Sequence, residues 1–194
     1  VKASRGLGDV YKRQILTDPR WDLKFIGMQI IIEGLALAAF QMLKQLSKDP
    51  LLTQLLHYVI RDEARHVTFG INYLEDFVKT LTDEEREERA EFAFEACVIS
   101  RERLINTRAM QKYLKMSEDE AREFTLQTSA NNTFRNFLFS RVIPNLSRIG
   151  LLTDNVRPKF DELGLLEFEH APDDFECDWN ELEKPLENFD EISA

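Results

Sequence analysis

The chain has few of the residues that interrupt helices and few that build a disulfide framework. Its 194 residues include 7 Gly, 6 Pro and 2 Cys. The long uninterrupted stretches that remain are rich in Glu, Arg, Leu and Ala, which favour helices. Cys97 and Cys177 lie far apart, which predicts unreactive thiols in a reducing compartment rather than a disulfide. We therefore expect an all-α, cytoplasmic protein.

Positive charge is also scarce. The chain carries 25 Lys and Arg against 35 Asp and Glu, a formal net charge of −10. This charge repels nucleic acid and anionic membranes, so we expect neither as a partner. The apolar run 25–40 is shorter than the ~20 residues of a membrane span and contains Gln29 and Glu33. No pattern typical of an export signal is present.

Three stretches of the sequence differ in character. Residues 1–14 show no hydrophobic period and resemble linker-derived sequence, so we exclude them from fold reasoning. Residues 15–166 read as a helical domain. Residues 167–194 hold eleven acidic residues and a single lysine, Lys184. This composition predicts a tail that is disordered or draped over the body, and docking to a partner is a second interpretation.

Hydrophobic periodicity and capping residues predict the helices of the domain. Asp49 is the expected N-cap of the second helix, and capping boxes open the third and fourth. Pro144 is expected to kink or break the fourth helix. The expected helices cover residues 18–46 (or 22–46), 50–79, 82–115, 117–149 and 158–163.

Glu63 and His66 are the first candidate functional pair. They are three residues apart, so on a helix they project from one face. A carboxylate and an imidazole placed this way can bind a transition metal. The Glu-x-x-His pattern alone is weak evidence, because it also occurs by chance on solvated helix faces.

Glu33 strengthens this metal hypothesis. It lies in a nearly continuous apolar segment, where an unpaired buried carboxylate must be protonated, paired with a base or bound to a metal. A salt bridge to an arginine is the structural alternative. Glu33 lies about 13 residues before the turn between the first two helices, and Glu63 about 13 after it. In an antiparallel pair both are therefore at the same height.

The segments Ile-Ile-Glu33-Gly-Leu and Arg61-Asp62-Glu63-Ala-Arg-His66-Val-Thr-Phe-Gly70 resemble the ferritin-like di-iron carboxylate superfamily. They are most similar to its oxygen-activating branch, the class I ribonucleotide reductase small subunit and related di-iron oxygenases. The resemblance implies a ferritin-like helical bundle with Glu33, Glu63 and His66 as metal ligands. It also implies that Asp62 hydrogen-bonds a ligand histidine of a partner helix. The implied cofactor is di-iron, with Mn/Fe as an alternative.

The sequence departs from that family in one respect. The family pattern also needs an earlier carboxylate and an earlier Glu-x-x-His, for which there is no room before Trp21. His57 lies about 180° around the helix from His66, and His170 lies in the acidic stretch. We therefore interpret the chain as the C-terminal part of a longer protein that lacks the N-terminal half of its bundle.

The resemblance implies an oxidoreductase that activates O₂ to oxidise an unknown small molecule, with an electron-donor protein and a homodimer as expected partners. A ribonucleotide reductase small subunit that generates a radical is one alternative. Iron storage and a purely structural helical bundle are others. We expect this chain alone to be inactive. Tyr73, about two turns from His66, is interpreted as a packed core tyrosine rather than a redox tyrosine.

Overall fold

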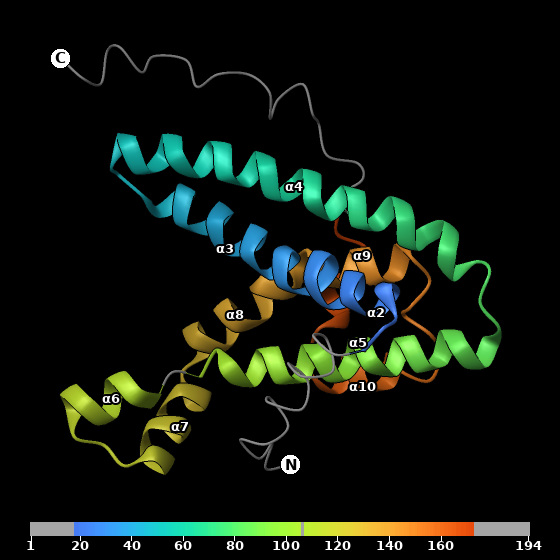
Figure 1. The fold of residues 1–194 in the computed structure, drawn as a ribbon. Helices are drawn as coiled ribbons and strands as arrows, with labels where there is room; N and C mark the ends of the chain where they lie inside the picture. The colour runs from blue at the N-terminus through green and yellow to red at the C-terminus, as the bar shows by residue number, and fades with distance from the viewer. Residues whose placement is uncertain (1–17, 106, 173–194) are drawn as a thin grey trace.

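The computed structural model describes residues 18–105 and 107–172, and every regular element in them is a helix. The all-α prediction is therefore confirmed (Figure 1). The elements are α2 (Trp21–Phe25), η1 (Ile26–Ile32), α3 (Glu33–Leu46), α4 (Pro50–Val78), α5 (Asp83–Arg103), α6 (Thr107–Leu114), α7 (Glu118–Gln127), α8 (Ser129–Phe137), η2 (Leu138–Ser140), α9 (Val142–Arg148), α10 (Arg157–Glu162) and η3 (Leu166–Phe168).

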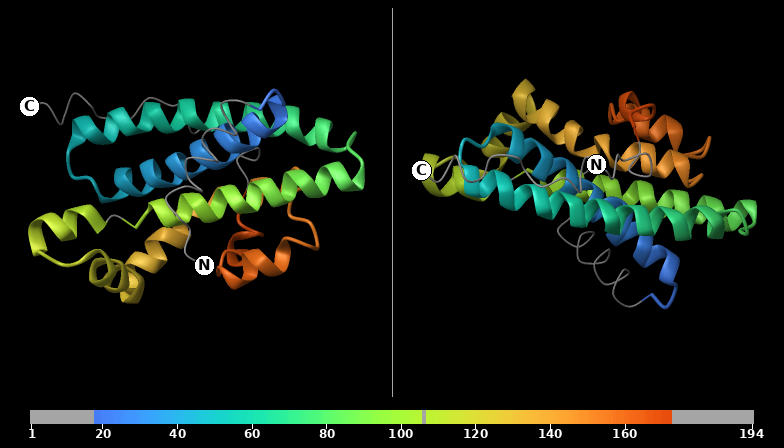
Figure 2. Two further views of the ribbon diagram at one scale, coloured as in Figure 1. Left: turned by 60° about the horizontal axis from the view of Figure 1, so that its bottom comes forward. Right: turned by 90° about the horizontal axis from the view of Figure 1, so that it is seen from above.

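The first helix is the central element of the fold. The elements α2, η1 and α3 form one continuous helix from Trp21 to Leu46, which contacts α4, α5, η2 and α9 (Figures 1 and 2). Its middle part, η1, is a π-helix, which the sequence did not predict. A π-helix bonds i to i+5 and so changes the direction of the side chains that follow it. The first of these side chains is Glu33.

This central helix is also long and apolar enough to cross a membrane, judged by length and composition alone. The helix, Trp21–Leu46, extends beyond both ends of the apolar run 25–40 that the sequence shows. The core helix of a soluble protein has the same composition, and Ile26, Ile30 and Ile31 are fully buried inside the structure. The finding by itself does not place the helix in a membrane.

A tight turn joins the central helix to α4, as the sequence predicts. The Asp49 side chain accepts a hydrogen bond of 2.9 Å from the Leu52 N–H, and Pro50 opens the helix. Both features stabilise a helix start. The two helices run antiparallel, side by side (Figure 1). The buried stripe of α4 follows helical spacing and consists of Leu56, Ile60, Ala64, Val67, Ile71, Leu74 and Val78.

Gly70 sets how closely these two helices approach. A Cβ added at Gly70 lies 2.6 Å from Cβ of Gln29 in η1, which is shorter than real contacts of this kind. No side chain fits at this position without a shift of the backbone. The absence of a side chain therefore allows the contact between η1 and α4.

The third and fourth helices were predicted as continuous, but the structure breaks each of them into shorter helices. The third ends at Arg103, and the chain turns at Ile105 before α6 begins, because α6 packs against α7 instead of extending α5. The fourth is broken at Thr128, which has an extended backbone, and again at η2. Both breaks come before Pro144. Pro144 itself does not break a helix, because it lies in the first turn of α9, where proline is tolerated.

The local signals at helix ends are confirmed. Capping boxes open α5 at Thr82 and α7 at Ser117, as expected. Gly150 and Gly164 follow α9 and α10 with positive φ angles of 79° and 68°. This left-handed conformation favours glycine at helix ends.

The predicted terminal segments lie largely outside the described residues. Nothing in the structure bears on residues 1–14 or 173–194. The first residues of the acidic stretch belong to the folded body, because Phe168 packs against the core and Glu169 accepts a hydrogen bond of 2.7 Å from Arg157.

A buried ion pair joins the start of the central helix to α5. Arg89 Nε donates to Asp22 Oδ2 over 2.8 Å, and the two residues are only 7% and 2% exposed. Arg89 lies in the charge-rich stretch 84–91, where the sequence alone suggests a solvated helix face, so its burial is a finding of the structure. A charge of this kind is buried only where a partner compensates it.

Replacing Gly70 by Ala tests the close approach of η1 and α4. We expect Gly70→Ala to lower the free energy of unfolding by about 1–3 kcal/mol, because the new methyl group overlaps Gln29. Helix propensity alone favours Ala by ~1 kcal/mol, so destabilisation identifies the packing contact. Urea unfolding measures both this variant and the exposed control Asn72→Ala. A stabilised Gly70→Ala protein contradicts the account.

Replacing Arg89 tests the buried ion pair. Arg89→Met leaves the Asp22 carboxylate buried without its cation, and we expect a loss of about 3–5 kcal/mol of unfolding free energy. Arg86→Met, which removes the exposed partner of Asp83, is the matched control and should cost less than about 1 kcal/mol. Equal losses in thermal or urea unfolding count against the structural role of Arg89.

Candidate metal centre

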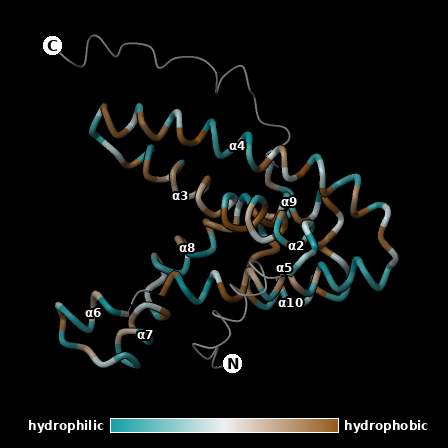
Figure 3. The backbone as a smooth tube through the Cα atoms, viewed as in Figure 1, coloured by the Kyte–Doolittle hydropathy of each residue, from teal (hydrophilic) through white to brown (hydrophobic). Residues whose placement is uncertain are grey.

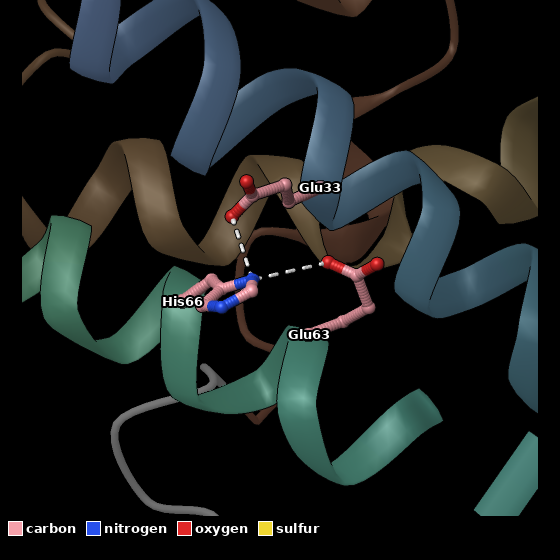
Figure 4. Close-up of side chains that lie close together, drawn as sticks. All are labelled: Glu33, Glu63 and His66. Carbon is pink, nitrogen blue, oxygen red and sulfur yellow. Dashed lines mark ion pairs between the residues drawn. The ribbon is translucent and has the colours of Figure 1, made fainter. Parts of the chain in front are cut away.

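Three potential metal ligands converge where α3 and α4 lie side by side. Glu33 is the first residue of α3, and Glu63 and His66 lie one turn apart in α4. One ligand atom from each residue lies within 4.8 Å of the other two (Figure 4). Glu33 and Glu63 therefore lie at the same level along the two helices, as predicted from their equal distances to the turn. Counting residues along two antiparallel helices sufficed to bring these three together.

The imidazole of His66 faces both carboxylates. Its Nδ1 lies 3.6 Å from Glu63 Oε2 and 4.0 Å from Glu33 Oε2 (Figure 4). These separations are too long for hydrogen bonds. Donor atoms that share one metal ion at about 2.1 Å lie about 3–4 Å apart. The spacing of the three atoms therefore suits a shared ion better than it suits direct bonding between the side chains.

Glu33 has the most unusual environment of the three. Its Oε2 atom is buried and has no hydrogen-bond partner in the described part of the chain. No arginine pairs with this oxygen there, so the salt bridge that was the structural alternative is not formed at this atom. Burial raises the pKa of Glu33, the charge of Glu63 raises it further, and His66 opposes both. An orphaned buried oxygen of this kind calls for a proton or a cation.

Asp62 lies beside the triad but is not part of it. It is exposed, and its Oδ1 lies 3.3 Å from Arg65 and 3.5 Å from Arg61. These contacts are local to α4. The hydrogen bond to a ligand histidine of a partner helix, which the family resemblance implies for Asp62, stays a prediction.

The other two histidines do not join the site. His57 is buried on the other side of α4, with Nδ1 3.2 Å from Nζ of Lys44. His170 is exposed, beyond η3. Cys97 is fully buried in α5, and burial raises the pKa of its thiol, so it stays protonated. Cys177 lies outside the described residues.

His66 and Tyr73 are both largely exposed, and the expected core position of Tyr73 is wrong. The His66 side chain is 61% exposed, whereas those of Glu33 and Glu63 are 19% and 25% exposed. Tyr73 is 56% exposed, so it is not a core tyrosine. Both belong to the side of α4 that faces away from its buried stripe. The triad is thus sheltered by protein on one side and open on the other.

Sequence reasoning missed the apolar residues around the open side of the triad. Met28 and Ile32 on η1, and Phe69 on α4, are each 41–50% exposed. A signal for them was present in α4, where large apolar residues recur at three- and four-residue steps on two opposite faces. A helix of this kind has more apolar surface than one neighbour can bury.

The chain matches no family model, no curated protein and no solved structure. What the described residues define is an all-helical fold with a carboxylate–imidazole cluster at its surface. The ferritin-like assignment stays a prediction from the motifs.

Replacing Glu33 by Gln tests the cost of the buried charge in metal-free protein. Burial raises the pKa of Glu33 in the folded state above the ordinary value of 4.5, so the ionised group destabilises the fold increasingly as the pH rises through that raised pKa. Below about pH 4.5 the group is protonated in both states, and this cost vanishes. We therefore expect Glu33→Gln to raise the melting temperature at pH 8, with a gain that shrinks as the pH falls.

The control for this experiment is Glu95→Gln, which changes an exposed glutamate of α5. Thermal unfolding in EDTA across the pH range measures both variants. A melting temperature that falls on Glu33→Gln at pH 8 contradicts a buried, unpartnered carboxylate.

Proposed function

We propose that this chain carries metal ligands of a di-iron, or Mn/Fe, carboxylate centre in an oxidoreductase that activates O₂. The observation that carries the proposal is the convergence of Glu33, Glu63 and His66 on one point, where the buried Glu33 oxygen has no hydrogen-bond donor among residues 18–105 and 107–172. A glutamate that is hydrogen-bonded to an arginine has no such atom.

The donor set indicates which metals fit. Two carboxylates and one imidazole suit iron or manganese, whereas a thiolate-preferring metal is disfavoured because Cys97 lies buried in α5, outside the cluster. When bound, such a metal pair supplies the electrons that reduce O₂ and the oxidising power that acts on a substrate.

The side chains of this chain have separable tasks in that centre. Glu33 and Glu63 supply negative charge and flexible oxygen ligands. His66 contributes Nδ1, which faces both carboxylates. Ile30 and Ile31, which precede Glu33 in η1, are fully buried and exclude water from that side of the helix. Because binding needs deprotonated carboxylates and a neutral imidazole, metal affinity should rise with pH.

Within this class we favour an oxygenase or oxidase that acts on a small molecule and receives electrons from a donor protein. The metal motif is equally compatible with a ribonucleotide reductase small subunit, so that alternative is kept. An iron-storage protein consumes O₂ without an organic substrate. Substrate-dependent O₂ consumption therefore separates it from an oxygenase.

Metal binding by the 194-residue chain tests the proposal directly. We expect anaerobic titration with Fe(II) or Mn(II), followed by elemental analysis, to show a site that Glu63→Gln weakens by more than about tenfold. Glu95→Gln is the charge-matched control and should leave the affinity unchanged. Wild-type protein that binds no metal, or that binds it as well as the Glu63→Gln variant, refutes the metal function.

A further inference from the structure

One side of α4 is largely apolar and is not covered by the residues that the structure describes. At successive steps of three or four residues it exposes Leu51, Leu55, Tyr58, Asp62, His66, Phe69 and Tyr73. This stripe lies on the side of the helix opposite its buried stripe, because helical spacing separates the two sets by about half a turn. Figure 3 shows apolar residues along both helices of the pair.

The central helix has a matching stripe. It exposes Trp21, Met28, Ile32, Leu43 and Leu46, each at least 41% accessible. Ring contacts link each stripe to the neighbouring helix: Trp21 lies 4.8 Å from Phe77 of α4, and Phe69 lies 5.9 Å from Phe25 of the central helix, measured between ring centroids. We refer to the two stripes together as the open face. It holds ten of the fifteen exposed large hydrophobic residues in the described part of the chain.

The size of the open face exceeds what a monomer usually exposes. Ten large side chains that are about half exposed present on the order of 1,000 Å² of apolar surface. Monomeric proteins expose apolar patches of roughly 300–600 Å². One partner in a stable protein interface contributes about 800 Å². The open face therefore has the area of a protein interface.

The metal ligands lie midway along the open face. Leu43, Leu46, Leu51 and Leu55 lie towards the turn between the two helices, and Trp21, Met28, Phe69 and Tyr73 lie towards the other end. Between them the triad opens outward through His66. Its three donor atoms approach from one side only, whereas iron and manganese take up to about six ligands. Any further donors to an ion held by the triad would have to approach from the open face.

We propose that a second copy of this chain covers the open face and that two triads together hold the metal pair. A two-fold axis in the plane between two open faces, at the height of the triad, places triad against triad and apolar stripe against apolar stripe. Such an isologous interface needs one self-complementary patch. This inference rests on the proposed metal function and adds where the remaining ligands come from.

Charge makes this association depend on metal. Two facing triads bring four carboxylates together, and each chain already carries a formal charge of −10. Without cations, like charges at this separation oppose docking. Two divalent ions carry four positive charges, which balance the four carboxylates. The dimer should therefore form when metal is added and separate when metal is removed.

Sedimentation of the 194-residue chain with Mn(II) or with EDTA tests the inference. In EDTA we expect a monomer. With Mn(II) present we expect a dimer that binds two Mn(II) ions, with a dimer dissociation constant at least about tenfold lower than in EDTA. The bound Mn(II) should give the electron paramagnetic resonance signature of a coupled pair rather than of isolated ions.

Variants separate the ligands from the interface. Leu55→Glu and Tyr73→Glu place charge on the open face away from the triad and should abolish the dimer. Tyr113→Glu, at a 73% exposed position of α6 outside the open face, should leave it intact. Glu63→Gln should remove the effect of metal on association. Circular dichroism confirms that each variant is folded.

The outcomes distinguish this inference from the proposed function. Tight binding of Mn(II) to a chain that stays monomeric refutes the dimer but leaves the metal function standing. A dimer that is indifferent to Mn(II) and to Glu63→Gln also refutes the inference. Metal-loaded chain that floats with liposomes instead of pairing with itself shows that lipid covers the open face. Absence of any metal binding refutes both proposals.

Discussion

The close contact between η1 and α4 is the constraint on which the site depends. Gly70 leaves room for Gln29, and no other residue does so without a shift of the backbone. Gln29 lies four residues before Glu33, and Gly70 lies four residues after His66. Because the helices are antiparallel, one turn of helix on each side leads from this contact to the triad. The register at Gly70 thus sets Glu33 opposite Glu63 and His66.

Two acidic residues of the central helix, Asp22 and Glu33, are both sheltered from solvent but differ in whether a positively charged side chain is hydrogen-bonded to them. Asp22 is buried and has a full partner in Arg89, so its charge is compensated and it ties the helix to α5. Glu33 is also sheltered, yet its Oε2 atom has no donor within the described residues. A folded chain tolerates such an atom at a cost, and a bound cation removes that cost. This contrast is why Glu33 carries the functional proposal.

The two-sided character of α4 connects the site to the proposed assembly. Its buried stripe holds the helix on the body, whereas its exposed stripe has apolar residues in the numbers usual for a second interface. His66 lies on the exposed stripe and Glu63 lies between the two. The same rotation of the helix therefore explains why the triad is sheltered beneath and open above.

The sequence by itself determined the helical class, the starts of α4, α5 and α7, and the meeting of Glu33 with Glu63 and His66. Each follows from local signals or from counting residues, because capping side chains bond within four residues and helical rise is uniform. Only the tertiary structure decided the π-helical turn before Glu33, the breaks at Ile105 and Thr128, the burial of Arg89 and the exposure of His66 and Tyr73. These depend on contacts between residues far apart in the chain, such as Gln29 on Gly70 and Asp22 on Arg89, which no local pattern encodes.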